Sequence, residues 1–348
     1  MNLWLVNYLC HNKTMPQTVR ITDVAREAGV SLATASRALN NVPTVNVELA
    51  EKVKETAKRL NYSPNRTAKN LRSRKSSTWA AIVPDAKNPF FTSIVEAVED
   101  VAWKSGFQVM FCNSREDVDR EQSYMREIAA SRLAGAIVAV VSTSRSTVQP
   151  LIDAKIPTVL IDRSLDEFNG LTIQTDNAKV GVLAAEHIEG IKAKKVLCVC
   201  GPEDASSTEE RAQSFISFMK GKCEVEFFRT DLQAREIDNR IENVLRGEER
   251  PDAVFTTNGP LTAWIYRSIK RVHLRIPEEI VLVGVDDEPW MEMVDTPVTI
   301  VAQPINEMGS LAAKILLKNG NYEGPSSGTV TLEPCLKRRV SSSLPAMR

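Results

Sequence analysis

Short apolar runs alternate with amphipathic stretches along most of the chain, and this alternation occurs twice. Before Thr175 the apolar runs read WAAIVP, FQVMFC, GAIVAVV and TVLID, with amphipathic stretches at 90–105, 119–132 and 146–154. After a helix expected at 176–192, the runs KVLCVC, VEFF, AVFTT and IVLVGV repeat the pattern. Alternating helices and uniformly apolar strands indicate parallel sheets covered on both faces. We therefore predict two doubly wound α/β lobes, with a ligand cleft beyond the carboxyl ends of their strands.

A different pattern precedes the lobes. The segment from Thr22 to Asn40, TDVAREAGVSLATASRALN, is typical of an amphipathic helix interrupted by a glycine. We predict that Thr22 caps a first helix, Gly29 makes a turn and Ser31 caps a second helix, with Asn46 capping a third. We expect Val24, Ala25, Val30, Ala35 and Leu39 to share one small core. On the third helix the apolar residues recur at helical spacing, at Leu49, Val53, Ala57 and Leu60. Two short helices braced by a third form an all-α helix-turn-helix domain, whose second helix enters the DNA major groove.

The charge distribution favours the same interpretation. The chain has 44 basic and 44 acidic residues in total, but residues 16–76 hold twelve basic and five acidic ones. No acidic residue occurs between Thr56 and Pro84. A basic N-terminal region joined to an acidic remainder indicates a polyanionic partner, most simply DNA. The alternative is a small three-helix bundle with a solvated basic face and no role in nucleic-acid binding.

The segments DVAREAGVSLATASRALN, VNVELAEKV and LNYSPNRTAKNLRS resemble the LacI/GalR (lactose-repressor) family of bacterial transcription regulators. The resemblance implies that Leu32 and Ala33 read bases and that Arg37 reads a guanine. Since Leu32 and Ala33 have no side-chain donors, they would read bases by apolar contact, for instance with a thymine methyl. The other residues expected to contact DNA in the helix-turn-helix are Ser31, Thr34, Ser36 and Asn40.

The basic segment SPNRTAKNLRSRKSS follows the third expected helix. Its composition indicates a basic linker, with two possible helical turns over 65–72. The family resemblance implies a hinge helix that folds on DNA, pairs with its dimer mate and inserts Leu71 into the minor groove at the centre of a palindrome. The further DNA-contacting residues expected in this segment are Asn65, Arg66 and Lys69.

The resemblance continues to about residue 340 through IVPDAKNPFFTSIVEAVEDVA, TDNAKVGVLAAEHI, VLVGVDDEPW and TPVTIVAQP, so the body is expected to be periplasmic-binding-protein-like. It implies that Phe91 stacks on an effector ring, that Arg211 grips its polar groups and that Asp286 accepts from them. Asn258 and Asp162, at strand ends, are further effector-binding candidates. Such groups suit a small polar molecule such as a sugar or nucleoside, with a ribose-like pentose preferred.

Two departures from the family pattern concern the effector. Gly259 stands where the family usually has an aspartate, which removes a carboxylate from the cleft rim. Ser214 stands where the E-R-x-x-G segment usually has its glycine.

Enzymatic and membrane functions find little support in the sequence. No GxGxxG or GxxxxGK[ST] motif occurs, the three histidines are dispersed, and Cys198 and Cys200 are typical of buried strand thiols. We therefore expect no catalytic site, no metal site and no cofactor. No apolar run reaches 18 residues, so we expect no membrane span and a cytoplasmic location.

The prediction is a dimeric repressor that binds a palindromic double-stranded DNA operator and whose affinity is modulated by an effector in the inter-lobe cleft. Alternatives are a regulator of the same fold controlled by a protein partner, a solute-binding protein for transport, and an enzyme. The predicted divisions are a disordered leader or a segment before a true start at Met15 (1–17), the helix-turn-helix (18–63), hinge and linker (64–77), the effector-binding and dimerisation domain (78–340) and a tail (341–348). Lobe 1 would hold about 78–173 and 300–322, and lobe 2 about 174–297 and 323–340.

Overall fold

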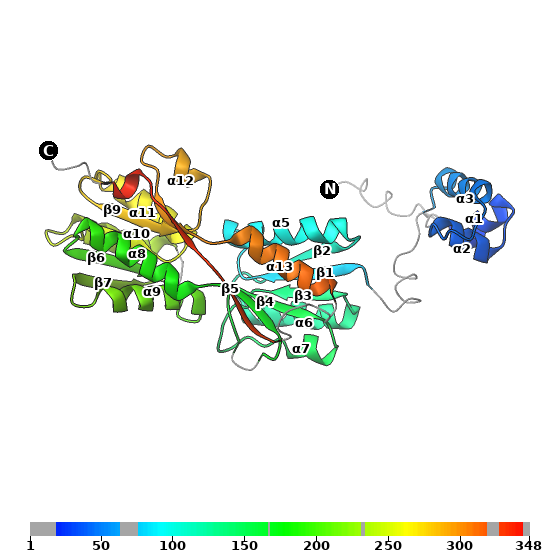
Figure 1. The fold of residues 1–348 in the computed structure, drawn as a ribbon, viewed down its shortest axis with the longest axis horizontal. Helices are drawn as coiled ribbons and strands as arrows, with labels where there is room; N and C mark the ends of the chain where they lie inside the picture. Colours follow the sequence, from blue (N-terminus) through cyan, green and yellow to red (C-terminus); the bar gives the residue numbers. More distant parts are fainter. Residues whose placement is uncertain (1–18, 63–75, 166–167, 231–233, 319–326, 344–348) are drawn as a thin grey trace, which may run out of the picture. The chain divides into compact units, whose positions relative to one another are not determined.

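The structure is a computed structural model that describes residues 19–62, 76–165, 168–230, 234–318 and 327–343. The chain divides into two compact units, Met1–Arg74 and Lys75–Arg348 (Figure 1). Among the described residues, no helix has both the length and the apolar character needed to cross a membrane.

The described part of the N-terminal unit consists of helices α1 (Ile21–Ala28), α2 (Leu32–Leu39) and α3 (Val47–Arg59). Gly29 ends α1 with a φ of 67°, a left-handed conformation that glycine adopts without steric penalty. The Ser31 and Asn46 side chains accept hydrogen bonds from the amides of Thr34 (3.1 Å) and Glu48 (2.8 Å). Both predicted caps are therefore confirmed, and the three helices pack around the expected core.

Two details of this unit were predicted wrongly. Thr22 does not cap α1, because the helix begins at Ile21 and the Asp23 carboxylate accepts from the Arg20 amide at 2.9 Å. Leu49 does not face the core and is 41% exposed. Ala50, three residues before Val53, packs against the core in its place.

The first sheet of the C-terminal unit has the strand order β11-β5-β4-β3-β1-β2, and all its pairings are parallel. Its strands are β1 (Thr78–Val83), β2 (Gln108–Asn113), β3 (Gly135–Val138), β4 (Thr158–Ile161), β5 (Leu171–Thr175) and β11 (Gly328–Leu332). One face is covered by α5 (Pro89–Lys104) and α13 (Ile305–Leu317), which pack side by side (Figure 1). The other face is covered by α6 (Val118–Ser131) and α7 (Gln149–Asp153).

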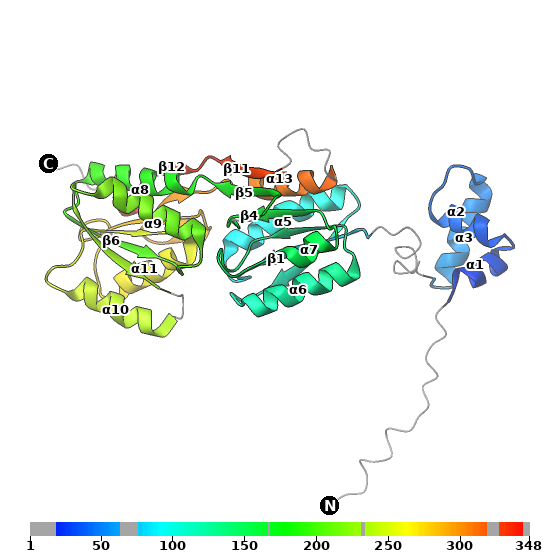
Figure 2. The ribbon, with the colours of Figure 1, turned by 90° about the horizontal axis from the view of Figure 1, so that it is seen from below.

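The second sheet has the order β12-β10-β9-β8-β6-β7, with β12 antiparallel to β10 and the other pairings parallel. Its strands are β6 (Lys195–Cys200), β7 (Glu224–Arg229), β8 (Ala253–Thr256), β9 (Val281–Val285), β10 (Thr299–Ala302) and β12 (Cys335–Lys337). Its helices are α8 (Asn177–Ile191), α9 (Ser206–Met219), α10 (Ala234–Arg246), α11 (Gly259–Arg271) and α12 (Trp290–Met293). Figure 2 shows α8 and α9 on one face and α10 and α11 on the other. The predicted pair of doubly wound lobes is confirmed.

The predicted lobe boundaries near the C-terminus are wrong. Residues 300–322 were assigned to lobe 1, but β10 pairs with β9 in the second sheet. Residues 323–340 were assigned to lobe 2, but β11 pairs with β5 in the first sheet. The chain therefore passes between the sheets at 175–177, 302–305 and 332–335.

The expected tail also begins too early. A short 3-10 helix, η1 (Val340–Ser342), packs on the second sheet. Within it, the Ser341 hydroxyl donates to the Leu282 carbonyl at 2.6 Å and accepts from the Thr299 amide at 2.8 Å. Ser341 and Ser342 are both buried, so the folded body extends past the predicted end at 340.

Candidate functional site: a polar pocket between two sheets

Two aspartates occupy equivalent positions in the two sheets. Asp162 directly follows β4 and Asp286 directly follows β9, with left-handed φ angles of 66° and 73°. The Asp162 amide donates to Ile173 on β5 at 2.9 Å, and the Asp286 amide donates to Val301 on β10 at 3.1 Å. Aspartate is among the few non-glycine residues that tolerate this conformation. Each strand therefore ends by presenting a buried carboxylate at its carboxyl end.

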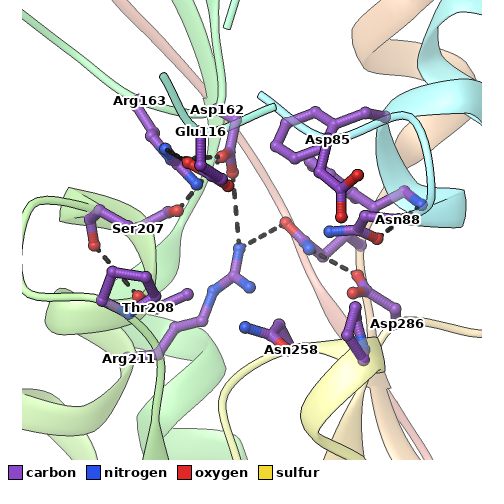
Figure 3. Close-up of a pocket in the computed structure, with 16 residues that line it drawn as sticks. Asp85, Asn88, Glu116, Asp162, Arg163, Ser207, Thr208, Arg211, Asn258 and Asp286 are labelled. Carbon is purple, nitrogen blue, oxygen red and sulfur yellow. Dashed lines mark hydrogen bonds and ion pairs between the residues drawn. The ribbon is translucent and has the colours of Figure 1, made fainter. Parts of the chain in front are cut away.

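These carboxylates line a pocket of about 500 Å³, a volume that includes space open to solvent (Figure 3). The pocket is lined by Asp85, Asn88, Phe90, Phe91, Glu116, Asp162, Arg163, Pro202, Ala205, Ser207, Thr208, Arg211, Asn258, Pro260, Asp286 and Gln303. All five residues predicted to bind an effector (Phe91, Asp162, Arg211, Asn258, Asp286) are among them. The structure thus brings together residues that are nearly 200 positions apart in the sequence.

Arg211, on α9, makes three hydrogen bonds within the pocket region. Its Nε donates to Asn177 Oδ1 at 2.8 Å, its Nη1 to the Thr257 carbonyl at 2.9 Å and its Nη2 to Gln303 Oε1 at 2.7 Å. The same Nη2 lies 3.9 Å from the Asp162 carboxylate. The guanidinium is 2% exposed, so its orientation is fixed before any ligand arrives.

Gln303 joins Arg211 to Asp286. Its Oε1 accepts from Arg211, and its Nε2 donates to Asp286 Oδ1 at 2.6 Å. The other Asp286 oxygen accepts from the Gly259 amide at 3.0 Å. Burial raises the pKa of the Asp286 carboxyl, while the charge of Arg211 and these two hydrogen bonds oppose that rise. Gln303 was not among the residues predicted for the site.

Arg163, which follows Asp162 after β4, is held in place on the first-lobe side of the pocket. Its Nη1 donates to the carbonyls of Val140 (3.0 Å) and Val141 (2.6 Å), and it lies 3.4 Å from Glu116 Oε2. Its Nε lies 3.6 Å from the Asp162 carboxylate, which also accepts from the Ser207 hydroxyl at 3.3 Å. Figure 3 shows Arg163 together with Glu116, Asp162 and Ser207. The sequence signal for Arg163 was its position directly after Asp162 at a strand end.

Two asparagines cap helices that begin at the pocket. Asn88 Oδ1 accepts from the Phe90 amide at the start of α5 (3.1 Å), and Asn258 Oδ1 accepts from the Leu261 amide at the start of α11 (2.9 Å). Because each side-chain oxygen is engaged within the protein, the amide nitrogen is the group that can donate to a ligand. Phe91 belongs to the core of the first lobe and also lines the pocket, beside Phe90 with ring centroids 5.1 Å apart.

The two departures from the family pattern have local packing consequences. Ser214 lies on α9 against Gly181 of α8, where a Cβ would lie 2.1 Å from Ser214 Oγ and 2.2 Å from the Arg211 carbonyl. At Gly259 a Cβ would lie 2.1 Å from Glu288 Oε1. The side chain of Glu288 therefore fills the space that a side chain at position 259 would need.

The residues expected to contact DNA from the helix-turn-helix lie on α2 or at its two caps. Leu32, Ala33, Arg37 and Asn40 are exposed or half-buried, as are Thr34 and Ser36. Ser31 caps the helix, and Asn40 Nδ2 donates to the Ser36 carbonyl at 2.7 Å. The hinge residues Asn65, Arg66, Lys69 and Leu71 lie outside the described residues, as does the expected leader at 1–17.

Comparisons with known proteins place the chain in a family. A model described as bacterial regulatory proteins, lacI family, matches residues 20–65, and a periplasmic binding protein-like domain matches residues 185–342. The chain is similar to the ribose operon repressor of Lactococcus lactis subsp. lactis, with 31% identity over 301 residues, covering 86% of this chain and 90% of that protein. It is also similar to the HTH-type transcriptional regulator KdgR of Bacillus subtilis, with 28% identity over 332 residues, covering 92% and 97%.

Solved structures agree with this assignment. A LacI family transcriptional regulator from Enterococcus faecalis with bound ribose is 28% identical, with a TM-score of 0.67, and the match covers 76% of this chain and 98% of that one. The structure of the lac repressor dimer bound to operator has a TM-score of 0.81, and the match covers 94% of this chain and 99% of that one. At 23% identity this similarity shows the shared fold alone. The chain belongs to the lacI family of bacterial regulatory proteins.

Proposed function

We propose that the protein is a cytoplasmic repressor that binds a palindromic DNA operator as a homodimer, and that a small sugar in the pocket changes its operator affinity. The observation that carries the proposal is the convergence of Asp162, Arg211 and Asp286 in one buried pocket, in a chain that also has a helix-turn-helix. The same chain thus has the parts that a ligand-controlled DNA-binding protein needs.

The outward-facing residues of α2 support a role in reading DNA. Arg37 can form the bidentate contact with guanine that is common in the major groove. Leu32, 45% exposed, and Ala33 can contact a thymine methyl. Ser31 and the amides at the start of α2 can hold a phosphate. Within this proposal, Leu71 of the hinge segment enters the minor groove, with Asn65, Arg66 and Lys69 contacting the backbone.

The pocket's polar groups suit a polyol. Asp162 and Asp286 can accept from hydroxyl groups, Arg211 and the asparagine amides can donate to hydroxyl or ring oxygens, and Phe91 offers an apolar face. We propose a pentose such as ribose. The similarity to ribose operon repressors supports this choice, as does the ribose-bound Enterococcus structure. A regulator from Alkaliphilus metalliredigens complexed with D-xylulofuranose is also similar, with 26% identity and a TM-score of 0.68.

The contacts of Arg211 suggest how sugar binding reaches the rest of the body. Asn177 lies where the chain passes from β5 to α8, and Gln303 lies where it passes from β10 to α13. A sugar that forms hydrogen bonds with Arg211 therefore contacts a residue that is itself bonded to two of the segments connecting the lobes. Lobe closure would alter the spacing of the two hinge segments in the dimer, with a coupling of about 1–3 kcal/mol between the sites.

The proposal is tested by selecting binding sites from a random duplex library with the full-length chain. A recovered pseudo-palindrome would support the dimeric reader and provide the duplex for titration with D-ribose and other monosaccharides. Unrelated recovered sequences would contradict sequence-specific binding. A selected operator whose affinity no sugar changes would favour control by a protein partner.

A further inference from the structure

Polar contacts join the loop after β3 to the loop after β6. The Thr143 amide donates to the Asp204 carbonyl at 3.1 Å, and the Ser144 hydroxyl donates to Asp204 Oδ1 at 3.2 Å. Arg145 approaches Asp204 Oδ2 with both Nε and Nη2, each at 3.1 Å. Together these residues, Thr143–Arg145 and Asp204, form a clasp between the first and second lobes.

The first-lobe side of the clasp is held in place by buried groups of its own lobe. The buried Glu121 carboxylate accepts from the Val141 amide at 2.6 Å, and Arg163 donates to the carbonyls of Val140 and Val141. Within the loop, the Ser142 hydroxyl accepts from the Arg145 amide at 3.1 Å. The loop is therefore fixed in the conformation that presents Arg145 to the other lobe, which reduces the entropic cost of forming the contact.

Both sides of the clasp adjoin the pocket. Arg163, which holds the Val140–Val141 backbone, also lines the pocket. On the other side Asp204 lies between Pro202 and Ala205, which both line the pocket. Separation of the lobes would break the clasp at the same time as it widened the pocket.

The clasp is exposed, which suits a contact that forms and breaks repeatedly. The side chains of Arg145 and Asp204 are 66% and 38% exposed. Exposed ion pairs are individually weak and are screened by salt, so the clasp can shift the balance between open and closed lobes without locking it.

We propose that Thr143–Arg145 and Asp204 form a clasp that keeps the lobes closed over the pocket before a ligand binds. The clasp sets the fraction of molecules that are already closed, and a ligand that binds the closed state shifts that fraction further. The proposal rests on the proposed function only in assigning a ligand to the pocket.

The test compares Asp204→Ala with the wild-type full-length chain in the absence of ligand. We expect a larger radius of gyration in small-angle X-ray scattering. We also expect several-fold faster hydrogen exchange at the Phe90 and Leu261 amides, which donate to the pocket-lining residues Asn88 and Asn258. Added salt should move the wild type toward the variant.

Two further variants separate the clasp from a general loss of surface charge. The exchange of charges, Arg145→Asp with Asp204→Arg, should restore much of the wild-type radius and exchange rates. Lys270→Ala removes an exposed ion pair to Asp295 (3.4 Å) inside the second lobe. This variant should change neither the radius of gyration nor the exchange rates.

The clasp would be overturned if Asp204→Ala, folded as judged by its melting temperature, matched the wild type in radius and in exchange at both amides. It would also be overturned if the charge exchange failed to restore either measurement. Since no ligand enters the comparison, such results would leave the proposed function standing. Failure of the proposed function would show in operator and sugar titrations instead.

Discussion

Arg211 donates from Nη2 to Oε1 of Gln303 over 2.7 Å, although the two residues are 92 positions apart. Both side chains are buried, at 2% and 8% exposure. Gln303 in turn donates to Asp286, so one amide orients both a cationic and an anionic group of the pocket. The orientation of these two charged groups therefore depends on a residue that carries no charge.

Replacement of Gln303 by alanine should weaken sugar binding without touching the DNA-binding unit. It leaves Arg211 Nη2 and Asp286 Oδ1 without this partner, and an unsatisfied buried polar group costs about 1–3 kcal/mol. We expect urea unfolding of the full-length chain to show a loss of that size and operator affinity without ligand to be retained. A variant as stable as the wild type, with unchanged sugar affinity, would contradict the role given to Gln303.

The Gly181→Ala substitution should displace Arg211 indirectly. The added Cβ would lie 2.2 Å from the Arg211 carbonyl, so α8 and α9 must separate. Overpacking of this kind costs about 1–3 kcal/mol, and sugar affinity should fall with stability. Gly190→Ala in the same helix is the matched control, because its Cβ meets nothing within 4 Å. Equal denaturation midpoints for the two variants would show that the close helix contact at Gly181 is unimportant.

The Glu288→Gln substitution should change the pH dependence of stability. Burial and the charge of Asp286 raise the pKa of Glu288 in the folded protein, although a hydrogen bond from Trp290 opposes the rise. An acid whose folded pKa is raised loses stability as pH rises from its ordinary pKa through the raised value. A glutamine side chain does not ionise, so the variant does not lose this stability as the pH rises. The variant should therefore gain stability relative to the wild type as pH increases from acid to neutral.

Urea denaturation at a series of pH values measures this effect, with Glu279→Gln as a control of opposite sign. Arg275 lowers the pKa of Glu279, so the wild-type carboxylate contributes stability that is present above its ordinary pKa. The Glu279→Gln variant should therefore lose stability relative to the wild type toward neutral pH. Parallel pH profiles for wild type and Glu288→Gln would refute the assignment.

The Arg37→Ala substitution should weaken operator binding by about 1–3 kcal/mol and relax specificity at one base pair of each half-site. Arg26→Ala serves as the comparison, since Arg26 is also exposed but pairs with Asp23 on α1 at 3.0 Å. Binding-site selection with both variants would decide the matter. If Arg37→Ala retained the full base preference of the wild type, Arg37 would not read a base.

The local parts of the fold could be predicted because their signals are local. The caps at Ser31 and Asn46 depend on residues two or three positions away. The short strands were harder to place, because β10 and β11 have only four and five residues and their partners decide which sheet each joins. Leu49 was misplaced because both it and Ala50 fit helical spacing, and the packing of Ala50 decides between them.

The site was predictable to the extent that strand ends and a family resemblance point to it. Asp162, Asn258 and Asp286 each follow a strand, where ligands bind in doubly wound folds. Gln303 has no such signal, because its importance comes from two partners brought to it by the chain passing between the lobes. The position of the Glu288 side chain could not be predicted from the sequence either, because it depends on the space left by the missing side chain at Gly259.

The central claim is that a sugar in this pocket controls operator affinity. The most direct measurement is the operator dissociation constant of the full-length chain, with and without D-ribose and a panel of monosaccharides, for the wild type and Arg211→Ala. We predict that one pentose changes the wild-type constant by about 5- to 150-fold. Arg211→Ala should bind operator normally and not respond. A wild-type chain that binds its operator with the same affinity in every sugar, or a response that survives in Arg211→Ala, would contradict the account.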